Sequence, residues 1–337
     1  MAESAKPKKE NSGSRSKLMP ILLICAIAGG AYALFQPDIR EKAKQWFAGL
    51  RGSENASSES SDLPPIRPNR GNQIFIATFN ASPLDEAKLS SPAIVDHLAN
   101  TIRNFDIVAL QNIQLRNPDR LNVILKKLNS RGRYYKYVKS PGQIPSKRPF
   151  NAFIYDEASV LVDSRVMPLN DQKGRFSTEP IAALFCVRGP PADQAFTFIA
   201  LNVYIDPAER EAELKLLPNI WDSVKNARIW DKLNQNGSKE DDIILCASLQ
   251  TPPPYKETMG YMRYIEHALE NRSNMVGGNT LDDNILYDTR ATVERMGESA
   301  VYDLGRRLGL KPEETSQVTH HLPVWATFSI YEGGERR

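Results

Sequence analysis

The stretch FDIVALQN at residues 105–112 decides the fold class of this chain. It joins a continuous apolar run, Ile107 to Leu110, to two amide side chains, Gln111 and Asn112. A short run rich in apolar and β-branched residues, bounded by polar or turn residues, is typical of a β-strand. Strand ends lead into the loops that carry function, so the polar pair stands where a site residue is expected.

Runs of the same kind recur from residue 71 onward and predict strands at 74–79, 107–111, 135–139, 152–156, 181–187, 196–203, 243–247 and 324–330. Between them, apolar residues at helical spacing predict helices over 91–104 and 208–230. Many strands with few intervening helices favour two packed sheets with helices outside them.

The composition excludes several classes of protein. The 337 residues are 41% hydrophobic and 25% charged, which is ordinary for a globular chain and unlike collagen, a coiled coil or a disordered protein. From residue 71 onward, 32 Lys and Arg face 33 Asp and Glu, so the charge does not indicate a non-specific DNA binder. The three cysteines are too few for a disulfide framework, and we expect Cys186 and Cys246 to be buried free thiols.

Residues 18–35, LMPILLICAIAGGAYALF, are 18 consecutive uncharged residues. This is the length at which an apolar helix begins to span a bilayer. A slight excess of basic residues before it predicts a cytoplasmic N-terminus and a single-pass membrane protein whose domain lies on the non-cytoplasmic side. The alternative is a signal peptide cleaved after Ala31-Tyr32-Ala33, which would give a secreted protein.

The rest of the N-terminal part has the composition of a tether. Residues 38–50 have the pattern of a short amphipathic juxtamembrane helix, and residues 51–70 are rich in Ser, Glu, Pro and Asn, as flexible linkers are. The predicted divisions are a cytoplasmic basic tail (1–17), a transmembrane helix or signal anchor (18–35), a juxtamembrane helix and linker (36–70), a single domain (71–332) and a C-terminal tail (333–337).

Eight segments resemble, in order, the endonuclease/exonuclease/phosphatase superfamily, which has the deoxyribonuclease-I-like fold: 76–80 (IATFN), 105–112 (FDIVALQN), 151–155 (NAFIY), 176–180 (FSTEP), 198–207 (FIALNVYIDP), 243–250 (IILCASLQ), 283–286 (DNIL) and 319–325 (THHLPVW). The resemblance implies a four-layer α/β sandwich, in which two packed, mostly antiparallel sheets are flanked by helices and the site lies at one edge of both sheets. It also implies phosphoric-ester chemistry, because members are typically Mg-dependent phosphodiesterases or phosphomonoesterases that cleave nucleic acids, inositol phosphates or sphingomyelin.

The same resemblance implies which residues occupy the site. Three positions keep the residue type of the family: Asn80, Asp283 and His321. The others are substituted: Asn112 replaces the metal-binding Glu, Thr178 replaces the Arg of the Arg-Glu-Pro segment, Tyr204 replaces the first catalytic His, Ser248 and Gln250 replace the Asp and Asn of the Gly-Asp-Phe-Asn motif, and His320 replaces the Asp of the closing Ser-Asp-His motif.

These substitutions remove the charges on which the family's chemistry depends. An amide at Asn112 can coordinate a hard cation but brings no negative charge, so we expect no bound metal, and Mg or Mn only if the chain is active. With His320 in place of the Asp, we expect His321 to have no carboxylate to raise its pKa. His320 and His321 beside Asp283 could instead form a new metal or acid–base set, although adjacent side chains on a strand point in opposite directions.

The sequence therefore predicts a catalytically degenerate pseudo-nuclease, held at a membrane, that binds a phosphorylated ligand or a protein partner. The alternative is a working divalent-metal-dependent phosphodiesterase or nuclease with a remodelled site. A third hypothesis is a cell-surface structural protein. Nucleic-acid binding stays open, because Lys126 to Lys139 form a basic segment interleaved with tyrosines that could follow a phosphate backbone or a lipid surface, or could be a solvated Lys face.

Overall fold

The computed structural model describes residue 64 and residues 71–139, 149–163, 166–169, 175–227, 240–255 and 264–334. The chain divides into Met1–Ser57 and Ser58–Arg337, and every described residue belongs to the second unit. The predicted tail, the membrane segment 18–35 and the tether up to residue 70, apart from Pro64, lie outside the described residues. Among the residues that are described, no helix is long and apolar enough to cross a bilayer.

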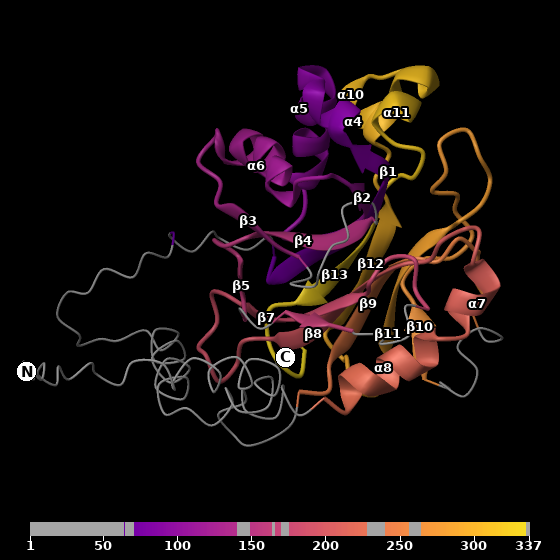
Figure 1. Ribbon diagram of the computed structural model, residues 1–337. Helices are drawn as coiled ribbons and strands as arrows, with labels where there is room; N and C mark the ends of the chain where they lie inside the picture. The colour runs from indigo at the N-terminus through magenta and orange to yellow at the C-terminus, as the bar shows by residue number, and fades with distance from the viewer. Residues whose placement is uncertain are drawn as a thin grey trace, which may run out of the picture. The chain divides into compact units, whose positions relative to one another are not determined.

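Two mixed sheets form the centre of the domain (Figure 1). The first has six strands in the order β12 (Arg295–Val301), β13 (Val324–Ser329), β1 (Gln73–Asp85), β2 (Ile107–Gln114), β4 (Phe150–Asp156) and β3 (Tyr135–Lys139). The second has seven, in the order β10 (Ile265–His267), β11 (Asp283–Asp288), β9 (Ile243–Ser248), β8 (Thr197–Tyr204), β7 (Ile181–Val187) and β5 (Val160–Val162), with β6 (Met167–Pro168) also paired to β7. All eight strands predicted from the apolar runs are present.

Each sheet is mostly antiparallel, as predicted, and contains one parallel pair among its described strands. These pairs are β1 with β2 and β8 with β9. In each pair both strands end at the same edge of the sheet, so the register places Asn80 beside Gln111 and Tyr204 beside Ser248. The antiparallel partner β11 begins at this edge, with Asp283 opposite Ser248. The topology therefore gathers the predicted site residues at one end of the sheets.

Helices cover the outer faces and complete the four layers (Figure 1). On the side of the six-stranded sheet lie α4 (Glu86–Ser90), α5 (Pro92–Ile102), the 3₁₀ turn η2 (Pro118–Leu121), α6 (Asn122–Asn129), α10 (Leu304–Leu308) and α11 (Pro312–Val318). On the side of the seven-stranded sheet lie α7 (Arg210–Leu214) and α8 (Leu217–Lys225). The DNase-I-like architecture implied by the resemblance is thus the one observed.

The two predicted helices differ in outcome. The helix predicted over 91–104 is α5, which begins with the side chain of Ser91 accepting a hydrogen bond from the Ile94 N–H (3.4 Å) and with Pro92 at its first position. The single helix predicted over 208–230 is wrong, because α7 ends before a turn at Lys215 and α8 then begins with Pro218 in its first turn. Proline favours a helix start since it has no N–H to donate inside a helix.

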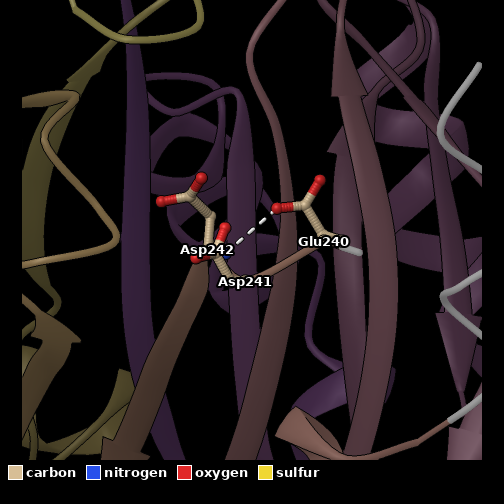
Figure 2. Close-up of side chains that lie close together, drawn as sticks. All are labelled: Glu240, Asp241 and Asp242. Atoms are coloured by element: carbon tan, nitrogen blue, oxygen red, sulfur yellow. Dashed lines mark hydrogen bonds between the residues drawn. The ribbon is translucent and has the colours of Figure 1, made fainter. Parts of the chain in front are cut away.

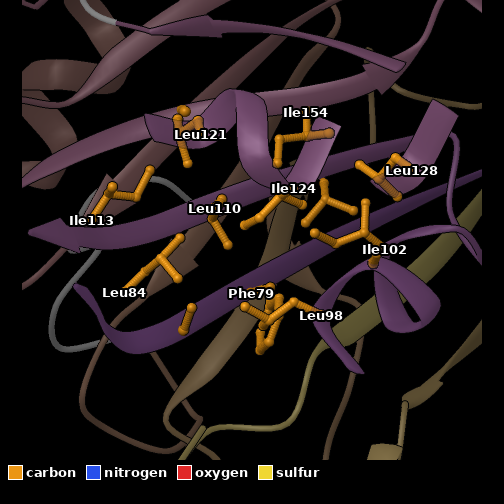
Figure 3. Packing of buried hydrophobic residues seen from close by; sticks show 14 of the residues in the cluster. Phe79, Leu84, Leu98, Ile102, Leu110, Ile113, Leu121, Ile124, Leu128 and Ile154 are labelled. Atoms are coloured by element: carbon orange, nitrogen blue, oxygen red, sulfur yellow. The ribbon is translucent and has the colours of Figure 1, made fainter. Parts of the chain in front are cut away.

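Two large clusters of buried hydrophobic residues pack against the six-stranded sheet. One lies between the sheets and includes Phe153, Phe185 and Phe198, where the rings of Phe185 and Phe198 stack with centroids 5.7 Å apart. The other lies between the six-stranded sheet and its helices, where Leu98 and Ile102 of α5 pack with Phe79 and the neighbouring aliphatic residues (Figure 3). Cys186 and Cys246 are buried free thiols, which confirms the prediction.

Candidate functional site

The centre of the candidate site is a buried carboxylate–imidazole pair, Asp283 and His321. Asp283 begins β11, and His321 lies between α11 and β13. His321 Nδ1 and Asp283 Oδ2 are 2.9 Å apart, with side-chain exposures of 6% and 0%. The prediction that His321 has no carboxylate is therefore wrong. The reason is that β11 supplies one from elsewhere in the chain, 38 residues away.

A third side chain holds this pair in place. Asn274 Nδ2 donates to the same Asp283 oxygen, Oδ2, at 2.6 Å, and Asn274 Oδ1 accepts from the Asp282 N–H at 2.8 Å. Burial alone lowers the pKa of His321, but the charge and hydrogen bond of Asp283 outweigh it, so the pKa of His321 is raised. His321 is therefore arranged to carry a positive charge, and its Nε2 makes no hydrogen bond within the described part of the chain.

His320 and His321 point in opposite directions, as expected for neighbours in an extended segment. His320 is exposed and contributes its backbone carbonyl to the Val276 N–H (2.9 Å), whereas His321 is buried against Asp283. The hypothesis of a joint set made by both histidines with Asp283 is therefore not supported by their placement.

Three predicted positions form a neutral network next to the pair. Asn80 Nδ2 and Gln250 Nε2 both donate to Ser248 Oγ, each at 2.9 Å. Thr319 Oγ1 lies 3.0 Å from the Asn80 carbonyl oxygen and accepts from the His321 N–H at 3.1 Å, so the network is tied to the segment that carries His321. The structure thus brings Asn80, Ser248 and Gln250 together with the pair, and substituted Ser248 accepts from both retained Asn80 and substituted Gln250 without any charge.

Asn112, at the family's metal position, makes a local hydrogen bond. Its Oδ1 accepts from Gln114 Nε2 at 2.9 Å, and its backbone has φ of 56°, a left-handed conformation that Asn tolerates better than most residues. Its neighbour Gln111 donates to Asn202 Oδ1 at 2.8 Å and so links the two sheets. The oxygen through which Asn112 would hold a cation already has a donor.

Tyr204, at the position of the first catalytic His, is buried at the end of β8. Burial, together with the charges of Asp206, Glu213 and Asp283, raises the pKa of Tyr204 to about 12. A phenol with this pKa stays protonated near neutral pH and cannot replace an imidazole as a base. Thr178 is also buried, and its hydroxyl has no hydrogen-bond partner within the described residues.

The sequence reasoning missed four residues that shape the site: Asn274, Thr319, Lys88 and Glu213. Lys88 Nζ donates to the carbonyls of Ala81 (2.8 Å), Ser82 (3.2 Å) and Val318 (2.8 Å), which joins the end of β1 to the segment before His321. Burial lowers the pKa of Lys88 to about 8, although Asp85 opposes this shift.

Glu213 is buried and accepts from the backbone N–H groups of Ser177 (2.6 Å) and Asp206 (2.8 Å), and burial raises the pKa of its carboxyl. No local pattern marks these four residues, because each acts on backbone or side chains brought together only by the fold.

The residues at this end of the sheets do not fit the family's metal. Asp283 is the one carboxylate among the nine positions considered; its Oδ2 is taken by His321 and Asn274, and its Oδ1 is buried without a partner in the described residues. Two groups of three acidic residues in the described part of the chain could hold a metal ion, and neither includes Asp283 or His321. Hard divalent cations need several charged or carbonyl oxygens, which this arrangement does not offer.

Two packed sheets flanked by helices give the chain the deoxyribonuclease-I-like fold, and a buried Asp–His pair lies at the strand ends. No model of a known protein family matches it. The chain is 25% identical over 269 residues to mouse deoxyribonuclease-1-like 1, covering 75% of this chain and 80% of that protein.

Solved structures show the same fold. The human Nocturnin catalytic domain with bound sulfate covers 78% of this chain and 95% of its own, with a TM-score of 0.53 and 14% identity. Humanized D. rerio TDP2 covers 77% and 99%, with a TM-score of 0.52 and 12% identity. The predicted resemblance to the endonuclease/exonuclease/phosphatase superfamily is confirmed.

Proposed function

We propose that this domain is a catalytically degenerate member of the superfamily, which binds a phosphate-bearing ligand at Asp283 and His321 without hydrolysing it through a metal ion. The observation that carries the proposal is the neutral network around Ser248. Ser248, which replaces a carboxylate, accepts from Asn80 and from Gln250, which replaces an amide, so this network needs no cation to offset charge.

The retained pair supplies the recognition chemistry. An imidazolium held by a carboxylate at Nδ1 keeps Nε2 as a charge-assisted donor, and such donors bind phosphate oxygens more strongly than neutral ones. The side-chain oxygen of Asn80 accepts a hydrogen bond from the Ser82 N–H (3.1 Å). Asn80 is neutral, so His321 is the charged donor next to this network. A phosphorylated small molecule or side chain is the ligand class that fits, and a partner protein that binds independently of phosphate is the other outcome of the test.

The competing function is a working phosphodiesterase with a remodelled site. The intact Asp283–His321 pair favours it, because a histidine with a raised pKa can act as a general acid. The sequence relative named deoxyribonuclease-1-like 1 also favours it. The enzyme hypothesis is weakened because Tyr204 cannot act as a second proton carrier and because Asn112 and Ser248 are not charged metal ligands.

The test compares turnover with binding in one set of proteins. Hydrolysis of bis-para-nitrophenyl phosphate and plasmid DNA is measured with Mg, Mn or Ca and with a chelator, and inorganic phosphate is titrated while the His321 imidazole is followed by NMR. We expect no metal-dependent turnover and a phosphate-induced shift of His321 that is lost in Asp283→Asn and kept in the control His320→Asn. Metal-dependent turnover that is abolished by Asp283→Ala would replace the proposal with the enzyme hypothesis.

A gain-of-function variant tests the assignment of the substituted positions. Asn112→Glu, Tyr204→His, Ser248→Asp, Gln250→Asn and His320→Asp together should raise divalent-ion affinity, because they restore two carboxylates and an imidazole beside Asp283 and a third carboxylate on the exposed neighbour of His321. Calorimetry with Mn²⁺ is the measurement. A folded variant with unchanged affinity would mean that the residue correspondence is wrong.

We further propose that residues 18–35 anchor the domain to a membrane, as a single-pass protein with the domain on the non-cytoplasmic side. The support is the uncharged 18-residue run and the basic residues before it. The anchored chain should stay in the membrane pellet after alkaline extraction and resist protease added from the cytoplasmic side. A soluble chain whose N-terminus begins after Ala33 would show instead that the segment is a cleaved signal peptide.

A further inference from the structure

A second cluster of charged residues lies at the end of the sheets opposite Asp283 and His321. Glu240 and Asp242 immediately precede β9, Glu294 precedes β12, and Glu332 follows β13. Since β9 runs from Ile243 to Ser248, and a strand rises about 3.3 Å per residue, Asp242 lies roughly 20 Å from Ser248. Figure 2 shows Glu240, Asp241 and Asp242 together, with the hydrogen bond from the Asp242 N–H to Glu240 Oε1 (3.0 Å).

The carboxylate oxygens of this cluster form two groups, each close enough to share one cation. One oxygen each from Asp242, Glu294 and Glu332 lie within 4.8 Å of one another, and the same holds for Glu240, Asp241 and Asp242. Both oxygens of Glu240 already accept hydrogen bonds, from the Asp242 N–H and the Thr197 hydroxyl, so the group of Asp242, Glu294 and Glu332 is the better cation site. Ca²⁺ fits this group better than Mg²⁺, because Mg²⁺ demands near-ideal octahedral geometry and is seldom held by protein carboxylates alone.

Two of these oxygens are buried and accept no hydrogen bond of ordinary geometry. Asp242 is 3% exposed and Glu294 is 1% exposed, and within the described residues Asp242 Oδ1 and Glu294 Oε2 have no such donor. Their nearest polar neighbours are each other's carboxyl groups and, for Asp242, the Thr292 side chain. No Lys, Arg or His in the described ranges forms an ion pair with any carboxylate of the cluster. Buried carboxylates without an opposite charge are costly, so this arrangement needs a positive ligand or shared protons.

The remaining oxygens are held by backbone and hydroxyl donors. Glu294 Oε1 accepts from the Gly333 N–H at 2.6 Å, Glu332 Oε2 accepts from the Thr197 N–H at 3.2 Å, and Glu240 Oε2 accepts from the Thr197 hydroxyl. Each of Glu294 and Glu332 therefore has one fixed oxygen and one that is left to bind a ligand. Outer hydrogen bonds of this kind orient the ligands of metal sites.

We propose that Asp242, Glu294 and Glu332 bind a calcium ion that ties together the starts of β9 and β12 and the segment after β13. The site is separate from the proposed phosphate site and does not depend on it. Its role is to stabilise the fold at an end of the sheets that carries none of the residues matched to the superfamily's chemistry.

Protons compete with the proposed ion. Burial, the largest cause, raises the pKa of Glu240 to about 8 and that of Glu332 to about 7, and the mutual repulsion of these groups adds to the rise. The carboxyls of Asp242 and Glu294 are raised in pKa for the same reasons. Protons and a cation therefore compete for the same oxygens, and calcium binding should release protons.

The experiment is calorimetric titration of the full chain with Ca²⁺, repeated with Mg²⁺, in two buffers of different ionisation enthalpy. We expect one Ca²⁺ per chain, proton release, and tighter binding of Ca²⁺ than of Mg²⁺. Glu294→Gln should weaken Ca²⁺ binding at least about tenfold, and the control Glu313→Gln, which removes an exposed charge on α11, should not change it. His321→Asn should also leave Ca²⁺ binding unchanged, which keeps this result separate from the phosphate site.

The proposal would be overturned by the absence of Ca²⁺ binding at millimolar concentration, or by equal Ca²⁺ affinities of the Glu294→Gln and Glu313→Gln variants. It would also be overturned if Glu294→Gln were more stable in chelator than the unaltered chain. That result would identify a pair of carboxyl groups that share a proton. If Glu294→Gln does not fold, Glu332→Gln replaces it. Glu332 is more exposed than Glu294, so its amide variant is tolerated better, and it should weaken Ca²⁺ binding in the same direction.

Discussion

Replacing Asp283 by Asn tests the buried pair directly, because it removes the charge and keeps the shape. His321 Nδ1 and Asn274 Nδ2 both donate to Asp283 Oδ2, at 2.9 and 2.6 Å, and an amide oxygen can still accept both bonds. The change therefore isolates the electrostatic contribution of the carboxylate. In the unaltered chain the pKa of His321 is raised above its unfolded value of about 6.5.

The sign of the pH dependence follows from this shift. A histidine whose folded pKa is raised contributes stability that is fully present below the unfolded pKa and is lost as the pH rises through the folded pKa. In Asp283→Asn the carboxylate no longer opposes burial, so the pKa of His321 should fall below its unfolded value. The variant should then lose stability on acidification, where the unaltered chain gains it.

The loss of stability in Asp283→Asn is largest at pH values at which the His321 imidazole is charged. Near pH 5.5 the variant must bury an imidazolium without its counter-ion or deprotonate it, at about 3–5 kcal/mol, the cost of breaking a buried ion pair. Near pH 9 the neutral imidazole loses only the extra strength of a bond to an ionised acceptor, about 1–2 kcal/mol.

Urea unfolding of both chains from pH 5.5 to pH 9 measures this difference, and NMR of the imidazoles reports the titration. His320→Asn is the matched control, because His320 is exposed and adjacent. A loss that is the same at all pH values, or larger at high pH, would show that the carboxylate does not stabilise a charged His321.

Two further predictions concern buried groups away from the pair. Lys88→Met should destabilise the domain by about 1–3 kcal/mol in urea unfolding, because three backbone carbonyls lose a charged donor. The control Lys126→Met, on the exposed face of α6, should change the free energy of unfolding by no more than about 0.5 kcal/mol. Equal effects of the two substitutions would contradict the bridging role of Lys88. Cys186 and Cys246 should resist labelling by a thiol reagent at pH 8 until denaturant is added, since burial raises the pKa of Cys186 to about 12 and raises that of Cys246 as well. Rapid labelling of two or more thiols in the folded chain would show that one of them reaches solvent.

The strands could be predicted because their sequence reflects burial on both faces. Ile107–Gln114 and Ile181–Val187 are apolar runs, and both are buried nearly throughout. The edge strand β12 was missed, because Arg295–Val301 reads RMGESAV and is only partly buried, so its residue types resemble those of a loop. Edge strands have one neighbour and one open side, and their pattern is correspondingly weak.

The site could be predicted residue by residue but not as a set of contacts. Asn80, Asp283 and His321 were identified by their place in segments that resemble the superfamily. The pairing of Asp283 with His321 was not predicted, because it depends on the register of β11 against β9 and on the path of the chain into β13. The acidic cluster was missed for the same reason, since Glu240, Glu294 and Glu332 are far apart in sequence and meet only when three strand ends meet.

The two ends of the sheets hold buried charge differently, and this affects how a metal experiment should be interpreted. At the end with Asp283, Ser248 accepts from the amides of Asn80 and Gln250, and Asp283 Oδ2 has a histidine and an amide as partners, whereas Asp283 Oδ1 has none in the described part of the chain. At the other end, the carboxylates of Asp242, Glu294 and Glu332 meet without an opposite charge in the described residues, and Asp242 Oδ1 and Glu294 Oε2 accept no hydrogen bond of ordinary geometry there. A chelator should therefore lower the stability of the domain through the second end while phosphate binding at His321 persists. Calcium-dependent stability alone would then be no sign of a catalytic metal, and only a turnover that depends on both the metal and Asp283 would show one.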